Sequence, residues 1–180
     1  MTSSQIFLLT GDLESGKTSL CQEIAHLANL SGSKVSGLIS PGVFSAGSKT
    51  AIDVQDLSTG ERHRLAVLKN KMETNLDTKR WSFFTEAVNW GNQALQKTTT
   101  CDLLIIDELG PLEFDRRQGW VEAFELIDRK DFQAALLVIR PSLIQQASSR
   151  WEIASIINLS GAESQNPTSQ ELFELLNLHN

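Results

Sequence analysis

A glycine-bounded loop directly after an apolar run constrains the fold of this chain more than any other feature. Residues 11–18 read Gly-Asp-Leu-Glu-Ser-Gly-Lys-Thr and follow the apolar residues 6–9. This is the Gly-x-x-x-x-Gly-Lys-[Ser/Thr] pattern of a phosphate-binding loop (P-loop), which has a strand before it and a helix after it. There, backbone N–H groups surround a phosphate and the helix N-terminus adds partial positive charge. The pattern therefore predicts an α/β protein that binds a nucleoside triphosphate.

The residue types in this loop have separate chemical roles. Gly11 and Gly16 permit close approach of the backbone to a phosphate. Lys17 is expected to reach the β- and γ-phosphates and to assist catalysis, and the Thr18 hydroxyl is expected to bind Mg²⁺.

Two carboxylates in the loop are unusual, because a polyphosphate repels like charge. We expect Asp12 and Glu14 to face solvent or a partner cation. The predicted nucleotide-binding residues are Gly11, Asp12, Leu13, Glu14, Ser15, Gly16, Lys17, Thr18 and Ser19.

A second motif lies at the end of a predicted buried strand. Residues 103–106 are Leu-Leu-Ile-Ile and are followed by Asp107 and Glu108. We expect Asp107 to hold Mg²⁺ beside Thr18, and Glu108 to orient the water that attacks the γ-phosphate. Two acids after a strand are usually a solvated strand end, but together with a P-loop they indicate a Walker B element.

Helical and strand patterns alternate along the rest of the chain. This order predicts one domain over residues 1–180, with three layers, a mostly parallel sheet, helices on both faces and a β-hairpin at the sheet edge. Residues 69–80 have no apolar period and are predicted to be a loop near the nucleotide or an exposed linker. Apolar spacing predicts helices at residues 19–31, 81–96, 120–127, 141–147 and 169–178, and strands at residues 35–39, 51–57, 63–68, 135–139 and 153–159.

Composition limits the possible partners and the compartment. The net charge of −6 argues against a broad nucleic-acid-binding surface, so we expect no nucleic acid partner. Cys21 and Cys101 lack redox or metal-ligand spacing and are predicted to be buried free thiols. The sequence shows neither a secretory leader nor a membrane-length span, and it predicts a cytoplasmic protein without a membrane partner. It names no protein partner.

The segment after the second motif resembles a known family. Residues 107–113 read Asp-Glu-Leu-Gly-Pro-Leu-Glu, which is similar to the Asp-Glu-Ile-Gly-Pro-Met-Glu element of the small cancer-related nucleoside-triphosphatase family. Residues 35–39, 52–62 and 65–66 also resemble that family, and the similarity extends from the P-loop to Phe114, about two-thirds of the chain.

The resemblance implies a P-loop enzyme of the catalytic-glutamate class. Such an enzyme hydrolyses ATP, GTP and other nucleoside triphosphates slowly, with Mg²⁺, to the diphosphate and phosphate, and selects loosely among bases. The chain departs from the family at residues 12–14, where members tend to have Pro or Gly, and in its divergent C-terminal third.

Several other residues are candidates for roles in the site. Glu113 and Arg140 have two interpretations each. Glu113 is either an acid close to the Mg²⁺ or the attacking water, or a cap that accepts backbone N–H bonds from its loop. Arg140 follows a predicted strand and either meets the γ-phosphate as a catalytic arginine or is simply exposed. Arg116 and Arg117 are rivals for that role, and Trp81 is a candidate for contact with a purine.

Two other functions fit the motifs. A nucleotide or small-molecule kinase also uses a P-loop, although a glutamate after the Walker B aspartate favours water as the acceptor. A nucleotide-gated binding module would use hydrolysis only to reset a switch. A nucleic-acid motor is disfavoured, because the sequence has no clustered basic helix and no second motor domain.

Overall fold

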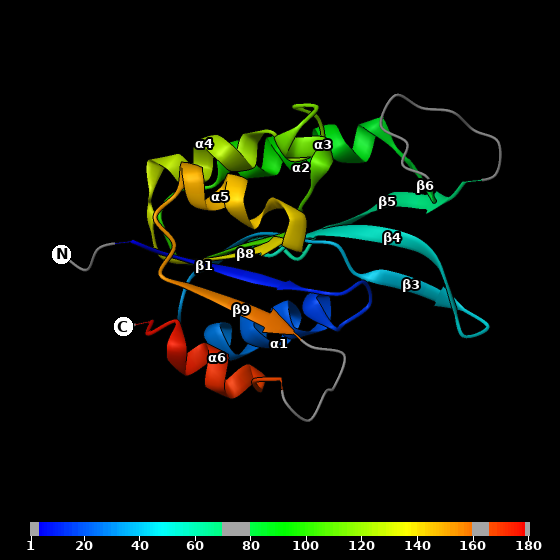
Figure 1. Ribbon diagram of the computed structural model, residues 1–180. Coiled ribbons are helices and arrows are strands. Elements are labelled where there is room, and N and C mark those ends of the chain that lie inside the picture. Colours follow the sequence, from blue (N-terminus) through cyan, green and yellow to red (C-terminus); the bar gives the residue numbers. More distant parts are fainter. Residues whose placement is uncertain (1–3, 70–79, 160–165, 179–180) are drawn as a thin grey trace.

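One sheet with helices on both faces organises the protein (Figure 1). The computed structural model describes residues 4–69, 80–159 and 166–178. Within this described part, nine strands pair in the order β6-β5-β4-β2-β7-β8-β1-β9, with β3 paired to β4. The strands are β1 (Gln5–Gly11), β2 (Val35–Ile39), β3 (Gly42–Ser45), β4 (Ser48–Asp56), β5 (Arg62–Leu68), β6 (Trp81–Phe83), β7 (Cys101–Leu109), β8 (Phe132–Ile139) and β9 (Ser155–Leu159).

The parallel half of the sheet carries the P-loop. Strands β2, β7, β8, β1 and β9 are parallel neighbours, so their carboxyl ends lie at one edge. β1 lies between β8 and β9, with Leu9 in register with Val138 on one side and Ile157 on the other. β1, β7 and β8 are almost uninterrupted apolar runs because both of their faces are covered.

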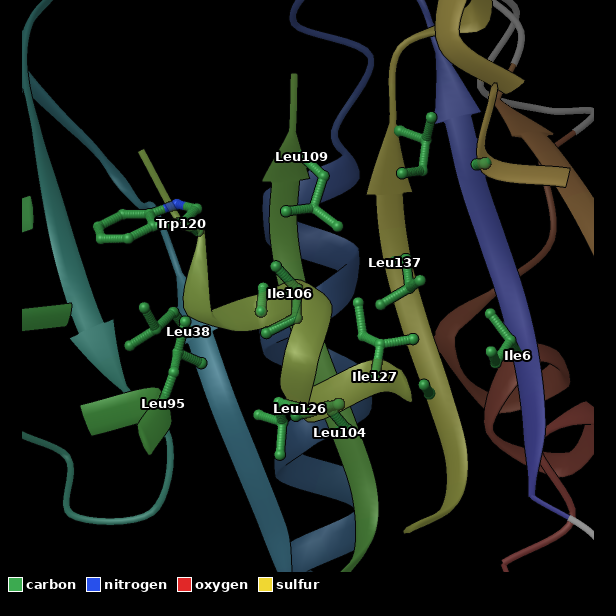
Figure 2. Close-up of a cluster of buried hydrophobic side chains, with 14 of the residues drawn as sticks. Ile6, Leu38, Leu95, Leu104, Ile106, Leu109, Trp120, Leu126, Ile127 and Leu137 are labelled. Carbon is green, nitrogen blue, oxygen red and sulfur yellow. The ribbon is translucent and has the colours of Figure 1, made fainter. Parts of the chain in front are cut away.

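Alternating side chains of the parallel strands enter two separate cores. In β1, Ile6 and Leu8 pack on the face covered by α2, α4 and α5, whereas Phe7 and Leu9 pack on the face covered by α1 and α6. Figure 2 shows the first of these cores. The helices are α1 (Lys17–Leu30), α2 (Thr85–Lys97), α3 (Pro111–Phe114), α4 (Glu122–Arg129), a 3₁₀ turn η1 (Pro141–Leu143), α5 (Ile144–Arg150) and α6 (Ser169–Leu175).

The antiparallel half differs from the sequence prediction. The predicted hairpin is present as β4 and β5, but it does not form the edge, because β4 pairs with β2 and β5 pairs with β6. The predicted helix at residues 81–96 is wrong at its start, since Trp81 pairs with Leu68 in the ladder and the helix begins only at Thr85. Most of the predicted loop at residues 69–80 lies outside the described residues.

Smaller differences concern the starts of two helices, whereas the prediction for the two cysteines is confirmed. The predicted first helix begins two residues earlier, at Lys17, and the helix predicted at residue 120 begins at Glu122. Cys21 and Cys101 are buried free thiols, and burial raises the pKa of Cys101 to about 11. Among the described helices, none has the length and apolar character needed to cross a membrane.

Candidate active site

The loop between β1 and α1 has the backbone of an anion-binding turn. Gly11 has φ 143° and Gly16 has φ 86°, values that side-chain-bearing residues rarely adopt. A Cβ at Gly11 would lie 2.5 Å from the backbone oxygen of Leu159, so the close approach of these strands also requires glycine. In the described part of the chain, no side chain caps the first N–H groups of α1. Those donors are therefore open to a phosphate.

Lys17 folds over the loop that precedes it. Its Nζ donates to the backbone oxygen of Gly11 (3.0 Å), to that of Asp12, and to Ser15 Oγ (3.1 Å). Burial lowers the pKa of Lys17, and the nearby carboxylates of Glu108 and Asp107 oppose that effect. The ammonium therefore lies within electrostatic reach of both acids of the predicted Walker B element.

Thr18 and Asp107 meet at the carboxyl edge of the sheet. Asp107 is 2% exposed, its Oδ2 accepts a hydrogen bond from the Ser40 N–H (2.9 Å), and the Thr18 side chain favours its charged form. Burial raises the pKa of Asp107, whereas the Ser40 N–H and the Thr18 side chain lower it. A hydroxyl and a carboxylate side by side are the hard oxygen donors that Mg²⁺ prefers. This pair fits the ion, which would take its other ligands from water and phosphate.

An interruption of the ladder between β7 and β8 separates the carboxylates of Asp107 and Glu108. The pairing of β7 with β8 shifts register between Ile106 and Leu109, so Asp107 and Glu108 lie within the irregularity. Glu108 has φ 67°, a left-handed conformation, and its side chain is exposed whereas that of Asp107 is buried. A bulge re-aims side chains, and here it turns one acid inward and the next outward.

Arg140, at the end of β8, pairs with Glu108. Its Nε donates to Glu108 Oε1 (2.7 Å), and its Nη2 donates to the same oxygen. Both side chains are about half exposed. The predicted catalytic arginine and the predicted water-orienting glutamate therefore belong to one ion pair.

Glu113 ties two backbone segments together. Its Oε2 accepts from the Gly110 N–H (2.7 Å), and its Oε1 accepts from the Trp120 N–H (3.0 Å). Burial raises the pKa of Glu113 to about 7, while these hydrogen bonds lower it. These two hydrogen bonds are the contacts expected if Glu113 caps its own loop by accepting backbone N–H bonds.

The remaining predicted loop residues are mostly exposed. Glu14 Oε1 lies 3.6 Å from Arg80 Nη1, so this carboxylate faces a partner cation. Asp12 and Ser19 are exposed, and Leu13 is 79% exposed. Arg116 and Arg117, the rivals of Arg140, are exposed on the segment after α3.

Two cationic side chains from the antiparallel half of the sheet reach the P-loop and Asp107, and sequence reasoning missed both. The Lys49 Nζ lies 5.7 Å, and the Arg80 guanidinium 5.4 Å, from the centre of the Trp81 ring. Lys49 also acts electrostatically on Asp107. No local pattern marks these residues, because β4 and β6 are far in sequence from the P-loop and from Asp107.

The fold and this constellation define the class. A strand leading through a glycine-bounded loop into α1, with a buried acid that the loop threonine acts on, is the architecture of a P-loop NTPase. A family model described as NTPase matches residues 6–150, and the chain belongs to that family. The resemblance noted from the sequence is thus confirmed at the level of the family.

Named relatives agree with this assignment. The nucleoside-triphosphatase THEP1 of Pyrobaculum aerophilum is 38% identical over 55% of this chain and 54% of its own. That of Methanosarcina acetivorans is 28% identical over 82% of this chain and 85% of its own. The chain thus spans about half the length of the first relative and most of the second.

Two solved structures share the fold. The solution structure of a human cancer-related nucleoside triphosphatase has a TM-score of 0.63 at 18% identity, covering 97% of this chain and 94% of that one. The crystal structure of THEP1 from the hyperthermophile Aquifex aeolicus has a TM-score of 0.67 at 13% identity, covering 96% of this chain and 99% of that one.

Proposed function

We propose that this chain is a Mg²⁺-dependent enzyme that hydrolyses ATP, GTP and other nucleoside triphosphates to the diphosphate and phosphate. The observation that carries this conclusion is that the Thr18 side chain favours the charged form of the buried Asp107, with Lys17 within electrostatic reach of the same carboxylate. A metal-phosphate site needs oxygen ligands and a phosphate-binding cation in one place. Membership in the NTPase family supports the same reaction class.

The P-loop and the two oxygen ligands would bind the triphosphate. The N–H groups at the start of α1 would hold phosphate oxygens, and Lys17 would leave the loop carbonyls to meet the β- and γ-phosphates. Thr18 and Asp107 would hold Mg²⁺, which supplies charge neutralisation on the phosphates when bound. A metal ion bound there would favour the ionised form of Asp107, which burial disfavours.

Glu108 is the residue that we assign to the attacking water. Its exposed carboxylate follows the metal ligand directly, so it can accept a hydrogen bond from a water near the terminal phosphate. Arg140 would keep this carboxylate in position through its ion pair, and it brings positive charge to the same place. Glu113 supports the site indirectly, because its carboxylate accepts the Gly110 N–H and so fixes the backbone two residues after Glu108.

The decisive measurement is phosphate release from ATP, GTP and CTP by the wild type and by Glu108→Gln, each with and without Mg²⁺. We expect Glu108→Gln to lower kcat by about 10²–10⁴-fold, a typical loss for a general base. Nucleotide affinity should stay within about threefold, because the phosphate ligands remain. Glu125→Gln, an exposed substitution on α4, is the matched control.

The outcomes separate hydrolysis from its alternatives. A fully active Glu108→Gln variant would remove Glu108 from the water-orienting role. A panel of nucleoside monophosphates in the same assay tests the kinase alternative, since diphosphate formation that requires an acceptor would exclude simple hydrolysis.

A further inference from the structure

The antiparallel half of the sheet extends past the edge at which the P-loop and the proposed metal ligands lie (Figure 1). β4 runs antiparallel to β2 and pairs with it through its last two residues, of which Gln55 is in register with Ile39. The start of β4 therefore lies beyond the carboxyl end of β2. The ladder continues from Ala51 through Val67 to Ser82, so the start of β6 lies in the same place.

Three side chains at these strand starts form a cation cluster, which consists of Lys49, Arg80 and Trp81. The Lys49 Nζ lies 5.7 Å, and the Arg80 guanidinium 5.4 Å, from the centre of the Trp81 ring. Both distances are within the range of about 6 Å for a cation over an aromatic ring. The ring thus holds two positive charges close together. Because like charges repel, an anion that contacts both is attracted to this cluster.

Arg80 is the member of the cluster that faces the P-loop. Its Nη1 lies 3.6 Å from Oε1 of Glu14, and the two side chains are 50% and 64% exposed. An ion pair this open to water contributes little stability. Phosphate oxygens bind a guanidinium more strongly, since they carry more charge and can accept two parallel N–H bonds. A phosphate on the P-loop can therefore replace Glu14 as the partner of Arg80.

Lys49 is the member that faces the metal ligands. A Cβ on Gly42 would lie 2.7 Å from Lys49 Cε, so the lysine side chain passes over this glycine. Gly42 follows Ser40 by two residues, and the Ser40 N–H donates to Asp107 Oδ2 (2.9 Å). The charge of Lys49 accordingly favours the charged form of Asp107. Since Mg²⁺ on Asp107 would repel this ammonium, a stable complex needs an anionic oxygen between them.

We infer that Lys49 and Arg80 bind the terminal phosphate of the nucleoside triphosphate, and that the antiparallel half of the sheet thereby makes the site selective for triphosphates over diphosphates. This inference rests on the proposed function. Arg140, at the end of β8, lies on the other side of β7 from the cation cluster in the sheet order. The terminal phosphate would thus have positive charge on both sides. Trp81 positions the two cations.

Comparison of a triphosphate with a diphosphate tests this assignment, because only the first has the terminal phosphate. We would measure binding of β,γ-imido ATP, which resists hydrolysis, and of ADP, each with Mg²⁺, by calorimetry to the wild type, Lys49→Gln and Arg80→Gln. Each variant should bind the triphosphate analogue about tenfold more weakly, through a lost charged hydrogen bond, and ADP within about twofold of the wild type.

The matched control is Lys97→Gln, which removes the same charge from an exposed position at the end of α2. This helix leads into the start of β7, whereas Asp107 lies near the end of that strand, so Lys97 lies at the opposite edge of the sheet. Both affinities of this variant should equal those of the wild type. Equal losses for the analogue and ADP in Lys49→Gln and Arg80→Gln would overturn the assignment, and so would no loss for either nucleotide.

The Glu14→Gln background separates phosphate binding by Arg80 from mere neutralisation of Glu14. If Arg80 only neutralised Glu14, Arg80→Gln would have no effect once Glu14 is uncharged. We expect the loss of about tenfold for the analogue to persist in that background, and its disappearance would overturn the role of Arg80. Phosphate release by the wild type tests the proposed function separately. A wild type that discriminates the analogue from ADP through these residues but releases no phosphate would refute hydrolysis and support the assignment of Lys49 and Arg80.

Discussion

Glu108 has a backbone conformation that few residues other than glycine adopt. Its φ of 67° costs on the order of 1–3 kcal/mol and persists only where the surroundings impose it. The ladder irregularity between β7 and β8 and the ion pair with Arg140 are the two surroundings that do so here. Strain of this kind is concentrated at functional sites, in keeping with the role we propose for Glu108.

Arg140→Ala should lower kcat by about 10²-fold or more, because Glu108 loses its partner and the site loses a positive charge. Arg140→Lys should recover only part of the rate, since an ammonium cannot reproduce the two N–H contacts of the guanidinium. Steady-state kcat and a separate nucleotide Kd would be measured. Arg129→Ala, which removes a surface ion pair with Asp131, is the control. Unchanged kcat in Arg140→Ala would contradict the assignment.

Glu113 makes stability depend on pH near neutrality. Burial raises its pKa from 4.5 to about 7, so the folded state binds this proton more tightly than the unfolded state. The contribution of Glu113 to the free energy of unfolding therefore falls as the pH rises from about 4.5 to about 7, and this contribution is constant above pH 7. Between pH 4 and pH 8, the free energy of unfolding of Glu113→Gln should rise by on the order of 1–3 kcal/mol relative to that of the wild type.

Urea unfolding at a series of pH values measures this difference. Glu125→Gln, which changes an exposed acid, should follow the wild-type curve. Parallel curves for Glu113→Gln and the wild type would show that Glu113 keeps its ordinary pKa in the folded protein.

At the scale of elements, the contact between α2 and the segment before α4 depends on one glycine. Gly91 lies within α2, where glycine costs about 1 kcal/mol relative to alanine. A Cβ there would lie 2.4 Å from Cζ3 of Trp120, whose side chain is 4% exposed. Figure 2 shows this indole among the packed side chains of the core, with Leu38 and Leu95 nearby. The helix thus gives up local propensity to make room for a buried ring.

Gly91→Ala should lower the free energy of unfolding by about 1–3 kcal/mol, although alanine is the better helix former, because the core becomes overpacked. Gln96→Ala, at an exposed position of the same helix, should change it by less than about 0.5 kcal/mol. Denaturant unfolding compares the two variants. A stabilised Gly91→Ala variant would mean that Trp120 moves aside at little cost.

At the scale of the whole molecule, the proposed nucleotide site joins segments that the sheet holds together. The P-loop extends β1, Asp107 ends β7, and β8 lies between these strands. A ligand that bridges them binds only the folded state. Saturation at 100 times Kd would add about 2.7 kcal/mol to the stability, or about 5–10 °C in Tm for a domain of this size.

Thermal unfolding with ATP and Mg²⁺ measures this shift. Chelation of the metal should remove most of it, because Thr18 and Asp107 would then contribute no metal contact to the triphosphate. Lys17→Ala should remove it as well. An equal shift with a chelator present would show that the nucleotide binds independently of Mg²⁺.

The class of fold and the family could be predicted from the sequence because local patterns carry them. The P-loop pattern needs only eight consecutive residues, and each apolar period reflects which face of its own element is buried. Residues 81–96 show where such reasoning fails, because Trp81 joins a ladder with Leu68 that no local pattern reveals. The edge position assigned to the hairpin failed similarly, since the pairing of β2 with β4 and the addition of β6 are long-range events.

By itself, the sequence determined the glycine-bounded loop before α1, the acidic strand end and the alternation of helices and strands, since each depends on neighbouring residues. Only the tertiary structure decided that Arg140 pairs with Glu108 and that Lys49 and Arg80 reach the P-loop region. The physical reason is that these contacts join strands distant in the chain. Their distances are set by the order of strands in the sheet and by the packing of both cores.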